Sequence, residues 1–318
     1  MKKTILITTN FSFLDYKKMF SKKLNLIYAP AIKLLELKKL LVSTDGWICS
    51  PSPKYIINRK ILKNAKKLKY IVTPSTGTNH IDISYCKTNH IKVFSLSNTN
   101  TVNNIYASSE FTFLLSMIMI KNFKLGVNNA LNYKWRKNED SFRGNEIENK
   151  KISIIGFGRI GRNLAKYFKS LKADIYAYDI EKKNIPKYVS FSKNLKKVMI
   201  DAKIVFVCLK LNKNTYKFAN KDFFKLMNKN TIFINTSRGE IVDENELYKS
   251  LKDNKLYGAA LDVLDSEHLI NEKKKNKLIE YSKKNNNLII TPHMAGLTYE
   301  SESKAGTFAI NKINKLFK

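Results

Sequence analysis

The stretch that decides the fold is Lys151-Ile152-Ser153-Ile154-Ile155-Gly156-Phe157-Gly158-Arg159-Ile160-Gly161. Its first half, residues 151–155, is a mostly β-branched run of the kind that forms a buried parallel strand. Glycines follow at a regular spacing, and residues 159–170 repeat apolar side chains at the spacing of a helix. The stretch therefore predicts a buried strand, a tight turn and a helix, in that order.

Glycines with this spacing form a dinucleotide-binding turn when a strand precedes them and a helix follows. Gly156 permits the tight turn, Gly158 lets the backbone approach a pyrophosphate, and Gly161 lets the helix pack closely on the strand. The helix N-terminus offers free N–H groups and a positive dipole end to the phosphates. We therefore predict a Rossmann site for a dinucleotide.

An acidic residue at the end of the next strand narrows the choice of dinucleotide. Asp179 follows the predicted strand 174–178, and it lies 179 − 161 = 18 residues after Gly161. A carboxylate near this interval accepts hydrogen bonds from the adenosine ribose hydroxyls and repels a 2′-phosphate. The sequence thus predicts NAD as the cofactor, with Lys182 and Lys183 leaving some tolerance of NADP open.

The rest of the chain alternates short apolar runs with helical patterns. Strands are predicted at 4–8, 45–49, 68–73, 91–95, 204–209, 231–235, 257–261 and 288–291. Strands separated by helices form parallel βαβ units. We therefore predict an α/β protein with two doubly wound parallel-sheet domains. A flavodoxin-like substrate-binding domain comprises residues 1–100 and 296–318, and a Rossmann NAD-binding domain comprises residues 101–295.

Composition excludes some classes of protein and raises one question. The chain has 318 residues, 43% hydrophobic and 11% aromatic, which is enough for packed cores and excludes wholesale disorder. Lys and Arg number 58 against 26 Asp and Glu, a formal net charge of +32 that raises the question of a polyanionic partner. The lysines are nevertheless dispersed, and the densest cluster, Lys273-Lys274-Lys275, is short. We interpret them as a solvated surface and expect no nucleic-acid partner.

Apolar run length and cysteine spacing give further expectations. The longest apolar stretch, residues 111–120, is half the length that crosses a bilayer, so we expect no membrane span. The three scattered cysteines fit neither a disulfide framework nor a metal site: Cys49, Cys86 and Cys208. The sequence therefore predicts a cytoplasmic protein without a bound metal.

Three charged side chains follow later predicted strands, where an open sheet places its ligands: Arg238, Glu267 and His293. The segment Ser75-Thr76-Gly77-Thr78-Asn79-His80-Ile81-Asp82 precedes the glycine turn, and Asp262 lies between Arg238 and Glu267. In this order, the motifs closely resemble the D-isomer-specific 2-hydroxyacid dehydrogenases. The resemblance extends over about residues 68–298.

The resemblance implies hydride transfer between nicotinamide and a D-2-hydroxy acid/2-keto acid pair. The planar guanidinium of Arg238 suits the substrate carboxylate and carbonyl, and His293 suits the proton donor to the carbonyl oxygen. A carboxylate such as Glu267 would hold the other ring nitrogen of His293. The family usually has Glu-Pro at this point, whereas here His268 follows Glu267, so Asp265 is an alternative partner.

The resemblance also implies contacts outside this catalytic set. Backbone N–H groups of the first domain would complete the carboxylate site at Ser75, Thr76 and Gly77. The resemblance implies that Arg159 and Ile160 contact the pyrophosphate of the cofactor. Cys208 and Leu209 would lie beside the nicotinamide. Asp262 and the Thr236 main chain would orient the carboxamide. His80 either touches the substrate or makes a hydrogen bond within its own loop.

The identity of the substrate stays open at this point. The positive charge favours a phosphorylated acid such as 3-phosphoglycerate. A formate or phosphite dehydrogenase on the same scaffold and an NAD-sensing, corepressor-like binding protein are alternatives. The apolar helix predicted at 104–121 exceeds what one small domain readily buries, so we predict a homodimer that packs this helix and the segment through Trp135 against its mate.

Overall fold

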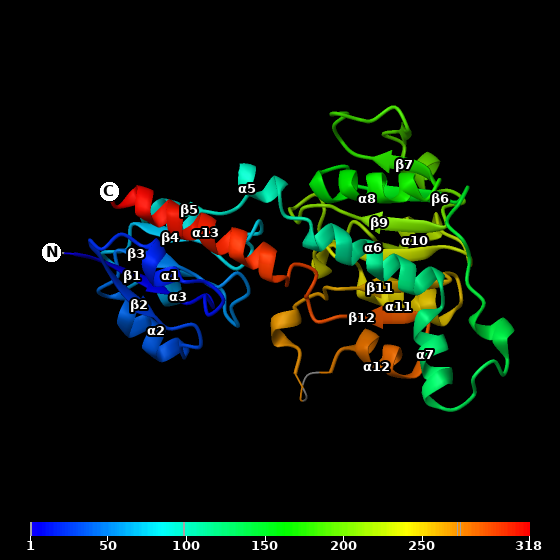
Figure 1. Cartoon of the computed structure of the whole chain (residues 1–318), viewed down its shortest axis with the longest axis horizontal. Coiled ribbons are helices and arrows are strands. Elements are labelled where there is room, and N and C mark those ends of the chain that lie inside the picture. The colour runs from blue at the N-terminus through cyan, green and yellow to red at the C-terminus, as the bar shows by residue number, and fades with distance from the viewer. Residues whose placement is uncertain (1, 98, 272, 274) are drawn as a thin grey trace. The chain divides into compact units, whose positions relative to one another are not determined.

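The computed structural model describes residues 2–97, 99–271, 273 and 275–318, so Lys274 of the lysine cluster lies outside the described residues. The chain divides into two compact units, Met1–Ile105 with Leu297–Lys318, and Tyr106–Gly296 (Figure 1). The sequence placed the divisions near residues 100 and 296. Residues 101–105 join the first unit because Val102 and Ile105 pack with Ala305 of the C-terminal helix.

The first unit contains a five-stranded parallel sheet in the order β2-β1-β3-β4-β5. Its strands are β1 (Lys3–Ile7), β2 (Leu24–Tyr28), β3 (Gly46–Ile48), β4 (Tyr70–Val72) and β5 (Lys92–Phe94). Four of them match the expected strands within a few residues. The sequence analysis missed β2, an edge strand that is buried at Leu24 but exposed or partly exposed along the rest of its length.

Helices cover both faces of the first sheet. They are α1 (Tyr16–Met19), α2 (Leu34–Leu41), α3 (Arg59–Leu62), α4 (Ile83–Thr88), α5 (Asn100–Asn103) and α13 (Tyr299–Leu316). Along β1, Ile5 and Ile7 pack against α13, whereas Leu6 between them packs against α2 and α3. This alternation buries both faces of the sheet, which is why its strands are apolar throughout.

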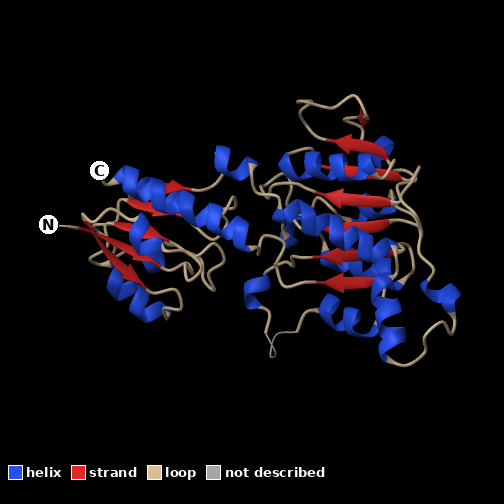
Figure 2. Cartoon of the chain, in the orientation of Figure 1, coloured by secondary structure: helices blue, strands red, loops and turns tan. Residues whose placement is uncertain are grey.

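The second unit contains a seven-stranded parallel sheet in the order β12-β11-β10-β9-β6-β7-β8, and its strands are the stacked arrows in Figure 2. They are β6 (Lys151–Ile155), β7 (Asp174–Tyr178), β8 (Val189–Phe191), β9 (Ile204–Val207), β10 (Ile232–Asn235), β11 (Gly258–Leu261) and β12 (Leu288–Ile290). Six were expected from the sequence. The three-residue edge strand β8 was missed because it is too short to show a pattern.

Helices again cover both faces of this sheet (Figure 1). They are α6 (Ala107–Ile120), α7 (Phe123–Leu131), α8 (Arg159–Ser170), α9 (Leu195–Met199), α10 (Lys221–Lys225), α11 (Glu244–Lys252) and α12 (Lys277–Lys284), with 3₁₀ turns η1 (Glu139–Phe142), η2 (Gly239–Ile241) and η3 (Glu267–Leu269). On β9, Val205 and Val207 enter one core, and Ile204 and Phe206 enter the other. The second unit is therefore a doubly wound Rossmann-type domain.

The start of helix α6 differs from expectation. The sequence pattern predicted a helix from residue 104, but α5 ends at Asn103 and α6 begins at Ala107. The Asn104 carbonyl accepts a hydrogen bond from Lys304 Nζ at 2.8 Å, and the Ile105 N–H closes a turn onto the Val102 carbonyl at 3.2 Å. These contacts hold the connecting residues out of the helix.

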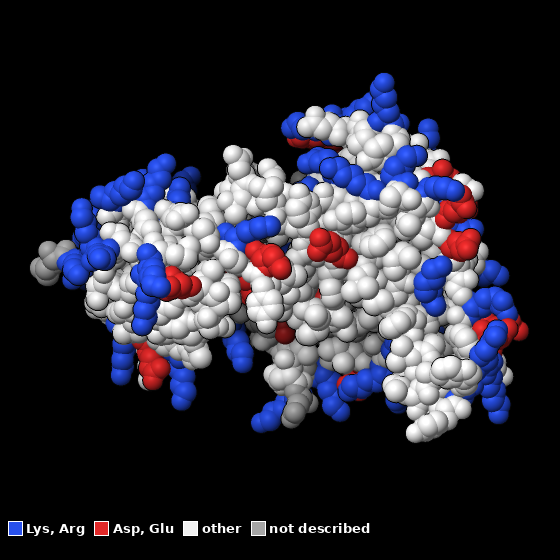
Figure 3. Space-filling view, in the orientation of Figure 1, with Lys and Arg blue, Asp and Glu red and all other residues white. Residues whose placement is uncertain are grey.

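The charge on the face of the molecule shown in Figure 3 is spread over many places. On the face shown in Figure 3, lysine and arginine side chains occur at many separate places in both units. This distribution is typical of a solvated surface. Among the described residues, no helix combines the length and the apolar character that crossing a bilayer requires.

Candidate active site

The glycine turn joins β6 to α8, as the sequence predicted. Gly156 has a positive φ of 96°, and a Cβ atom there would lie 2.6 Å from the Cys208 carbonyl oxygen. A Cβ at Gly161 would lie 2.4 Å from the Gly156 carbonyl oxygen. Any side chain at these two positions would force the turn apart, so glycine is required for helix α8 to start directly above the strand.

The outer side of the same turn leaves room for a ligand. Gly158 is exposed, and a Cβ built on it would meet no atom within 4 Å. Asp179, at the end of β7, accepts a hydrogen bond from the Phe157 N–H at 2.7 Å through Oδ2, and Oδ1 accepts one from the Glu181 N–H at 3.2 Å. The open backbone and the carboxylate beside it suit a bound dinucleotide: the N-terminus of α8 would hold its pyrophosphate and Asp179 would hold its ribose. These two contacts stay predictions.

The other predicted cofactor residues lie in the first turn of α8 and after the strands β9, β10 and β11. Arg159 and Ile160 form the first turn of α8, and burial lowers the pKa of Arg159. Cys208 and Leu209 follow β9, where the Cys208 N–H donates to the Ile155 carbonyl at 2.7 Å. Thr236 follows β10, and its hydroxyl pairs with the Thr112 hydroxyl of α6 at 2.6 Å. This contact could not be predicted from the sequence, since Thr112 lies 124 residues away.

A buried asparagine shapes the turn that carries Arg238. Asn235, the last residue of β10, is fully buried, and its Nδ2 donates to the Arg238 carbonyl at 2.9 Å. Its Oδ1 accepts from the Ser237 N–H at 3.0 Å and from the Ser237 hydroxyl at 2.6 Å. These bonds fold the chain back at the strand end, so Arg238 leaves the sheet at its carboxyl edge.

The guanidinium of Arg238 lies in a partly desolvated place. Burial lowers its pKa, and the nearby Glu240 and Glu267 carboxylates oppose this effect. Its Nη1 donates to the Ser237 carbonyl at 2.6 Å. An arginine held in this way stays charged, and its interaction with an anion is stronger than it would be in water.

His293 and Glu267 meet at the same edge of the sheet. The His293 Nδ1 is in direct hydrogen-bond contact with Glu267 Oε1, and the second Glu267 oxygen accepts from the Leu264 N–H at 3.4 Å. The side chains of His293 and Glu267 keep 37% and 35% of their surface exposed, so the pair is partly open to solvent. Of the two acids considered from the sequence, Glu267 is the partner. Asp265 instead accepts from the Ser266 hydroxyl at 2.9 Å.

Asp262 holds the loop that carries His293. It is fully buried, and Oδ1 accepts from the Thr291 hydroxyl at 2.5 Å and from the Met294 N–H at 2.9 Å. Its Oδ2 accepts from the Ala295 N–H at 2.8 Å. Three bonds thus fix the residues on either side of His293, whose φ of 56° lies in the left-handed region. The role at the carboxamide that the family resemblance implied for Asp262 and the Thr236 main chain stays a prediction.

The predicted carboxylate loop lies in the first unit, after β4. The Ser75 carbonyl accepts a hydrogen bond from the Leu96 N–H at 2.9 Å, and the Thr76 carbonyl accepts one from the Ser97 hydroxyl at 2.6 Å. The Gly77 carbonyl accepts one from the Ser75 hydroxyl at 2.7 Å. The loop is thus fixed through its acceptor groups.

Behind this loop lies a small polar network. The Thr73 hydroxyl contacts the Ser75 hydroxyl at 2.8 Å and His80 Nε2 at 3.4 Å, and the His80 ring also lies 3.8 Å from Cys49 Sγ. His80 therefore makes hydrogen bonds within its own unit, which is one of the two roles considered from the sequence. Burial raises the pKa of the Cys49 thiol to about 12, in agreement with an inert thiol.

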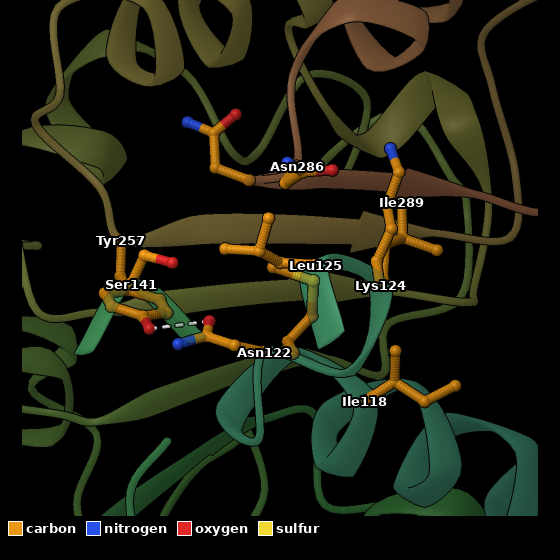
Figure 4. Close-up of a pocket in the computed structure, with 10 residues that line it drawn as sticks. Ile118, Asn122, Lys124, Leu125, Ser141, Tyr257, Asn286 and Ile289 are labelled. Atoms are coloured by element: carbon orange, nitrogen blue, oxygen red, sulfur yellow. Dashed lines mark hydrogen bonds between the residues drawn. The ribbon is translucent and has the colours of Figure 1, made fainter. Parts of the chain in front are cut away.

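The pocket in Figure 4 is separate from these residues. It has a volume of about 170 Å³, and its lining includes Asn122, Tyr257 and Asn286. Tyr257 precedes β11 and Asn286 precedes β12, whereas Asp262 and His293 follow these strands. In a parallel sheet, the pocket therefore lies at the amino edge and the charged cluster at the carboxyl edge. The Tyr257 hydroxyl donates to Asn122 Oδ1 at 2.7 Å across the pocket (Figure 4).

Comparison with known proteins gives a consistent picture. The sequence profile described as "D-isomer specific 2-hydroxyacid dehydrogenase, NAD binding domain" matches residues 113–295. A glyoxylate reductase of Thermococcus litoralis is 32% identical over 81% of this chain and 76% of its own length. A D-3-phosphoglycerate dehydrogenase of Methanocaldococcus jannaschii is 28% identical over 82% of this chain, which spans about half (48%) of that relative.

A solved structure agrees at the level of the fold. The D-lactate dehydrogenase of Aquifex aeolicus, crystallised with NAD and lactic acid, superposes with a TM-score of 0.84 at 22% identity, covering 99% of this chain and 95% of that one. The match to the family profile spans more than half of the chain and includes the glycine turn, Arg238, Glu267 and His293. The chain belongs to the D-isomer-specific 2-hydroxyacid dehydrogenases, and it is an oxidoreductase whose cofactor is NAD.

Proposed function

We propose that this enzyme reduces a small 2-keto acid to the D-2-hydroxy acid with NADH, and catalyses the reverse oxidation with NAD. This proposal rests on the contact between His293 and Glu267. The carboxylate of Glu267 also acts on Arg238, since it opposes the lowering of the guanidinium pKa by burial. When bound, NAD supplies or accepts the hydride. The chain's own residues then have to bind an anion, polarise a carbonyl and move one proton.

Each of these tasks has a candidate group. Arg238 binds the substrate carboxylate and polarises the adjacent carbonyl, since its planar donors match two oxygens at once. His293 donates the proton from Nε2 to the carbonyl oxygen as negative charge develops there. Glu267 accepts from Nδ1, which orients the ring and stabilises its cationic form. In the oxidation direction, neutral His293 takes the hydroxyl proton at Nε2.

The division of labour between the two units is part of the proposal. We assign cofactor binding to the second unit, through Gly156, Gly158, Gly161 and Asp179 with the residues around them. We assign to the first unit a share of substrate binding, in which the backbone N–H groups of the loop Ser75–Gly77 would add to the contact that Arg238 of the second unit makes with the carboxylate. The fixed acceptor side of that loop supports this role, because a loop of one conformation can present its donors to an anion without an entropic penalty.

A small unphosphorylated acid is the preferred substrate in this proposal. Glyoxylate reductases and a hydroxypyruvate reductase are among the relatives, with the Thermococcus litoralis enzyme 32% identical. A phosphorylated acid is the second candidate, which is supported by the net charge of +32 and by the relatives named D-3-phosphoglycerate dehydrogenase.

The test is NADH oxidation with glyoxylate, hydroxypyruvate, pyruvate and 3-phosphohydroxypyruvate. We expect turnover of at least one of the first three, and an Arg238→Gln variant with kcat/KM reduced by about 10³-fold, because a charge-assisted contact to the reacting acid is lost. Preference for 3-phosphohydroxypyruvate would select the second candidate. Undiminished activity of Arg238→Gln would refute the role of this residue.

We further propose that the protein is a cytoplasmic homodimer. Helix α6 is apolar around most of its circumference, and the segment after it exposes large apolar side chains: Leu131 (73%), Tyr133 (98%) and Trp135 (76%). Apolar groups exposed to this degree indicate a protein interface. We expect sedimentation to give a dimer, and Trp135→Asp with Leu131→Asp to shift it toward the monomer. A wild-type monomer at micromolar concentration would refute the proposal.

A further inference from the structure

A half-buried carboxylate on helix α11 has no place in the chemistry described so far. Glu244 is the first residue of α11, and it faces the loop between β11 and α12. Its Oε1 accepts a hydrogen bond from the Asp265 N–H at 2.7 Å, and its Oε2 accepts one from Asn276 Nδ2 at 2.9 Å. The two donors lie 21 and 32 residues further along the chain. One carboxylate therefore joins both ends of the segment 265–276.

The first of these bonds lies directly beside the catalytic acid. Asp265 precedes Ser266, which has left-handed backbone angles (φ 53°, ψ 34°), and Glu267 follows as the first residue of η3. The Leu264 N–H donates to the Glu267 carboxylate, so residues 264–267 form a tight turn around it. Glu244 accepts the hydrogen bond of the Asp265 N–H, which lies in the middle of this turn. The turn that carries Glu267 is therefore attached to helix α11.

The second bond fixes the other end of the segment. Asn276 caps α12, because its Oδ1 accepts from the Leu278 and Ile279 N–H groups at 2.8 and 3.3 Å. Its Nδ2 is then the group that points to Glu244. Both ends of the side-chain amide are bonded, with the oxygen on the helix and the nitrogen on the carboxylate, so the loop base cannot shift without breaking one of these bonds.

The position of Glu244 is electrostatically costly. Burial raises the pKa of its carboxyl group, and the nearby carboxylates of Asp265 and Glu240 raise it further, whereas the bonds from Asn276 and the Asp265 N–H act in the opposite direction. Asp243 caps α11 by accepting from the Asn245 and Glu246 N–H groups, so the Glu244 carboxylate is not the capping group. Its two bonds to the loop, together with the positive N-terminal end of the helix, offset the cost of burial.

We propose that Glu244 is a positioning residue, which holds the turn 264–267 so that Glu267 stays in contact with Nδ1 of His293. This inference rests on the proposed function, because it assigns a task within the same catalytic pair. Glu244 contacts neither substrate nor cofactor in this role. It acts through Glu267, and it fixes the His293 tautomer that carries its proton on Nδ1 and leaves Nε2 as the proton acceptor.

The first test measures that tautomer without any substrate. The chain has four histidines, so two-bond ¹H–¹⁵N spectra can be assigned with a His293→Gln variant. In the wild type we expect the Nδ1–H tautomer at His293, and in Glu267→Gln a shift toward the Nε2–H form. Glu244→Gln should shift in the same direction, because its amide NH₂ would face one of the two donors. The matched control is Glu246→Gln on the same helix. It removes a carboxylate that accepts a hydrogen bond from Lys249 Nζ at 2.7 Å.

The second test is kinetic. With the best keto acid of the panel, we expect Glu244→Gln to lower kcat about tenfold with the KM for NADH changed less than twofold, since a misplaced proton donor loses rate and not cofactor affinity. The double variant Glu244→Gln/Glu267→Gln should be no slower than Glu267→Gln alone. Asn276→Ser keeps a capping oxygen and removes the donor to Glu244, so it should reproduce the tautomer shift to a smaller degree.

The outcomes separate this inference from the proposed function. Two results would overturn the role of Glu244. The first is an unchanged His293 tautomer in a folded Glu244→Gln variant, while Glu267→Gln shifts it. The second is an additive loss of kcat in the double variant. If Glu244→Gln does not fold, Asn276→Ser decides by the same spectrum. Absence of turnover by the wild-type enzyme on the whole panel counts against the proposed function alone, because the tautomer measurement needs no reaction.

Discussion

The carboxyl edges of the two sheets differ in the kind of polar group they carry. In the second unit, the residues that follow the strands include Asp179, Arg238 and the pair Glu267–His293, all of them charged or able to become so. In the first unit, the corresponding edge joins hydroxyl, thiol and imidazole groups, with Thr73 between Ser75 and His80. Two sheets of the same architecture thus support different chemistry, because the loops after the strands differ.

We call the edge with Asp179, Arg238, Glu267 and His293 the charged edge, and the edge with Thr73, Ser75 and His80 the neutral edge. The charged edge needs more internal support than the neutral edge. Asn235 ties the turn of Arg238, and Asp262 fixes the residues around His293 through three hydrogen bonds. A charged group that is partly removed from water is stable only when its neighbours are fixed in a favourable geometry. The first unit fixes its loop with hydroxyl-to-carbonyl bonds, which suits recognition of a substrate rather than transfer of a proton.

The largest expected effect comes from removing the proton donor of the charged edge. His293→Gln should lower kcat for keto-acid reduction by about 10³-fold, because Gln cannot transfer a proton at neutral pH. Fluorescence titration with NADH should give the wild-type dissociation constant. His268→Gln serves as the control, since His268 is exposed and next to Glu267 in the chain. A loss of less than tenfold in His293→Gln would contradict the assignment of proton transfer to the second unit.

Whether a feature of the fold could be predicted from the sequence depends on how far apart in the chain its interacting residues lie. The glycine turn and β6 are local patterns, and β6 and α8 have the bounds that the sequence predicted. The edge strands β2 and β8 were missed because a short or half-exposed strand shows no clear pattern. The start of α6 was placed wrongly because a distant lysine, Lys304, holds Asn104 outside the helix.

The same reasoning applies to the candidate site. Arg238, Glu267 and His293 follow strands and could be found from the family resemblance. The sequence could not decide between Asp265 and Glu267, since the left-handed turn at Ser266 determines which acid points to His293. The loop contacts of Asp262 and Glu244 were not foreseen. They bridge residues 21 to 33 positions apart, and only the packed loops show them.

A smaller effect is expected at the neutral edge. Ser75→Ala removes the hydroxyl that donates to the Gly77 carbonyl at 2.7 Å and contacts Thr73. Loss of one neutral hydrogen bond, worth about 1 kcal/mol, should raise KM for the keto acid about fivefold. We expect kcat to stay within twofold of the wild type. The control is Thr88→Ala, which removes an exposed hydroxyl bond within α4. A fall in kcat as large as that of His293→Gln would remove the distinction between the two edges.

A buried thiol at the same edge affects the stability of the fold and not the reaction. Cys49 is fully buried, and burial raises the pKa of its thiol from 9.0 to about 12. Between these values the folded protein keeps the proton and the unfolded chain releases it, so the free energy of unfolding falls as the pH rises from 9 to 12. Cys49→Ala removes this contribution. Its melting temperature should therefore decline less between pH 8 and 10.5 than that of the wild type.

A second buried thiol in the same unit gives a parallel test. Burial also raises the pKa of Cys86, in helix α4, to about 11. The free energy of unfolding that it contributes therefore falls with rising pH in the same direction as that of Cys49. Thermal melts of Cys49→Ala and Cys86→Ala at pH 8 and 10.5 should both show a smaller decline in melting temperature than the wild type. Curves parallel to the wild type in both variants would mean that these thiols ionise in the folded protein as readily as in the unfolded chain.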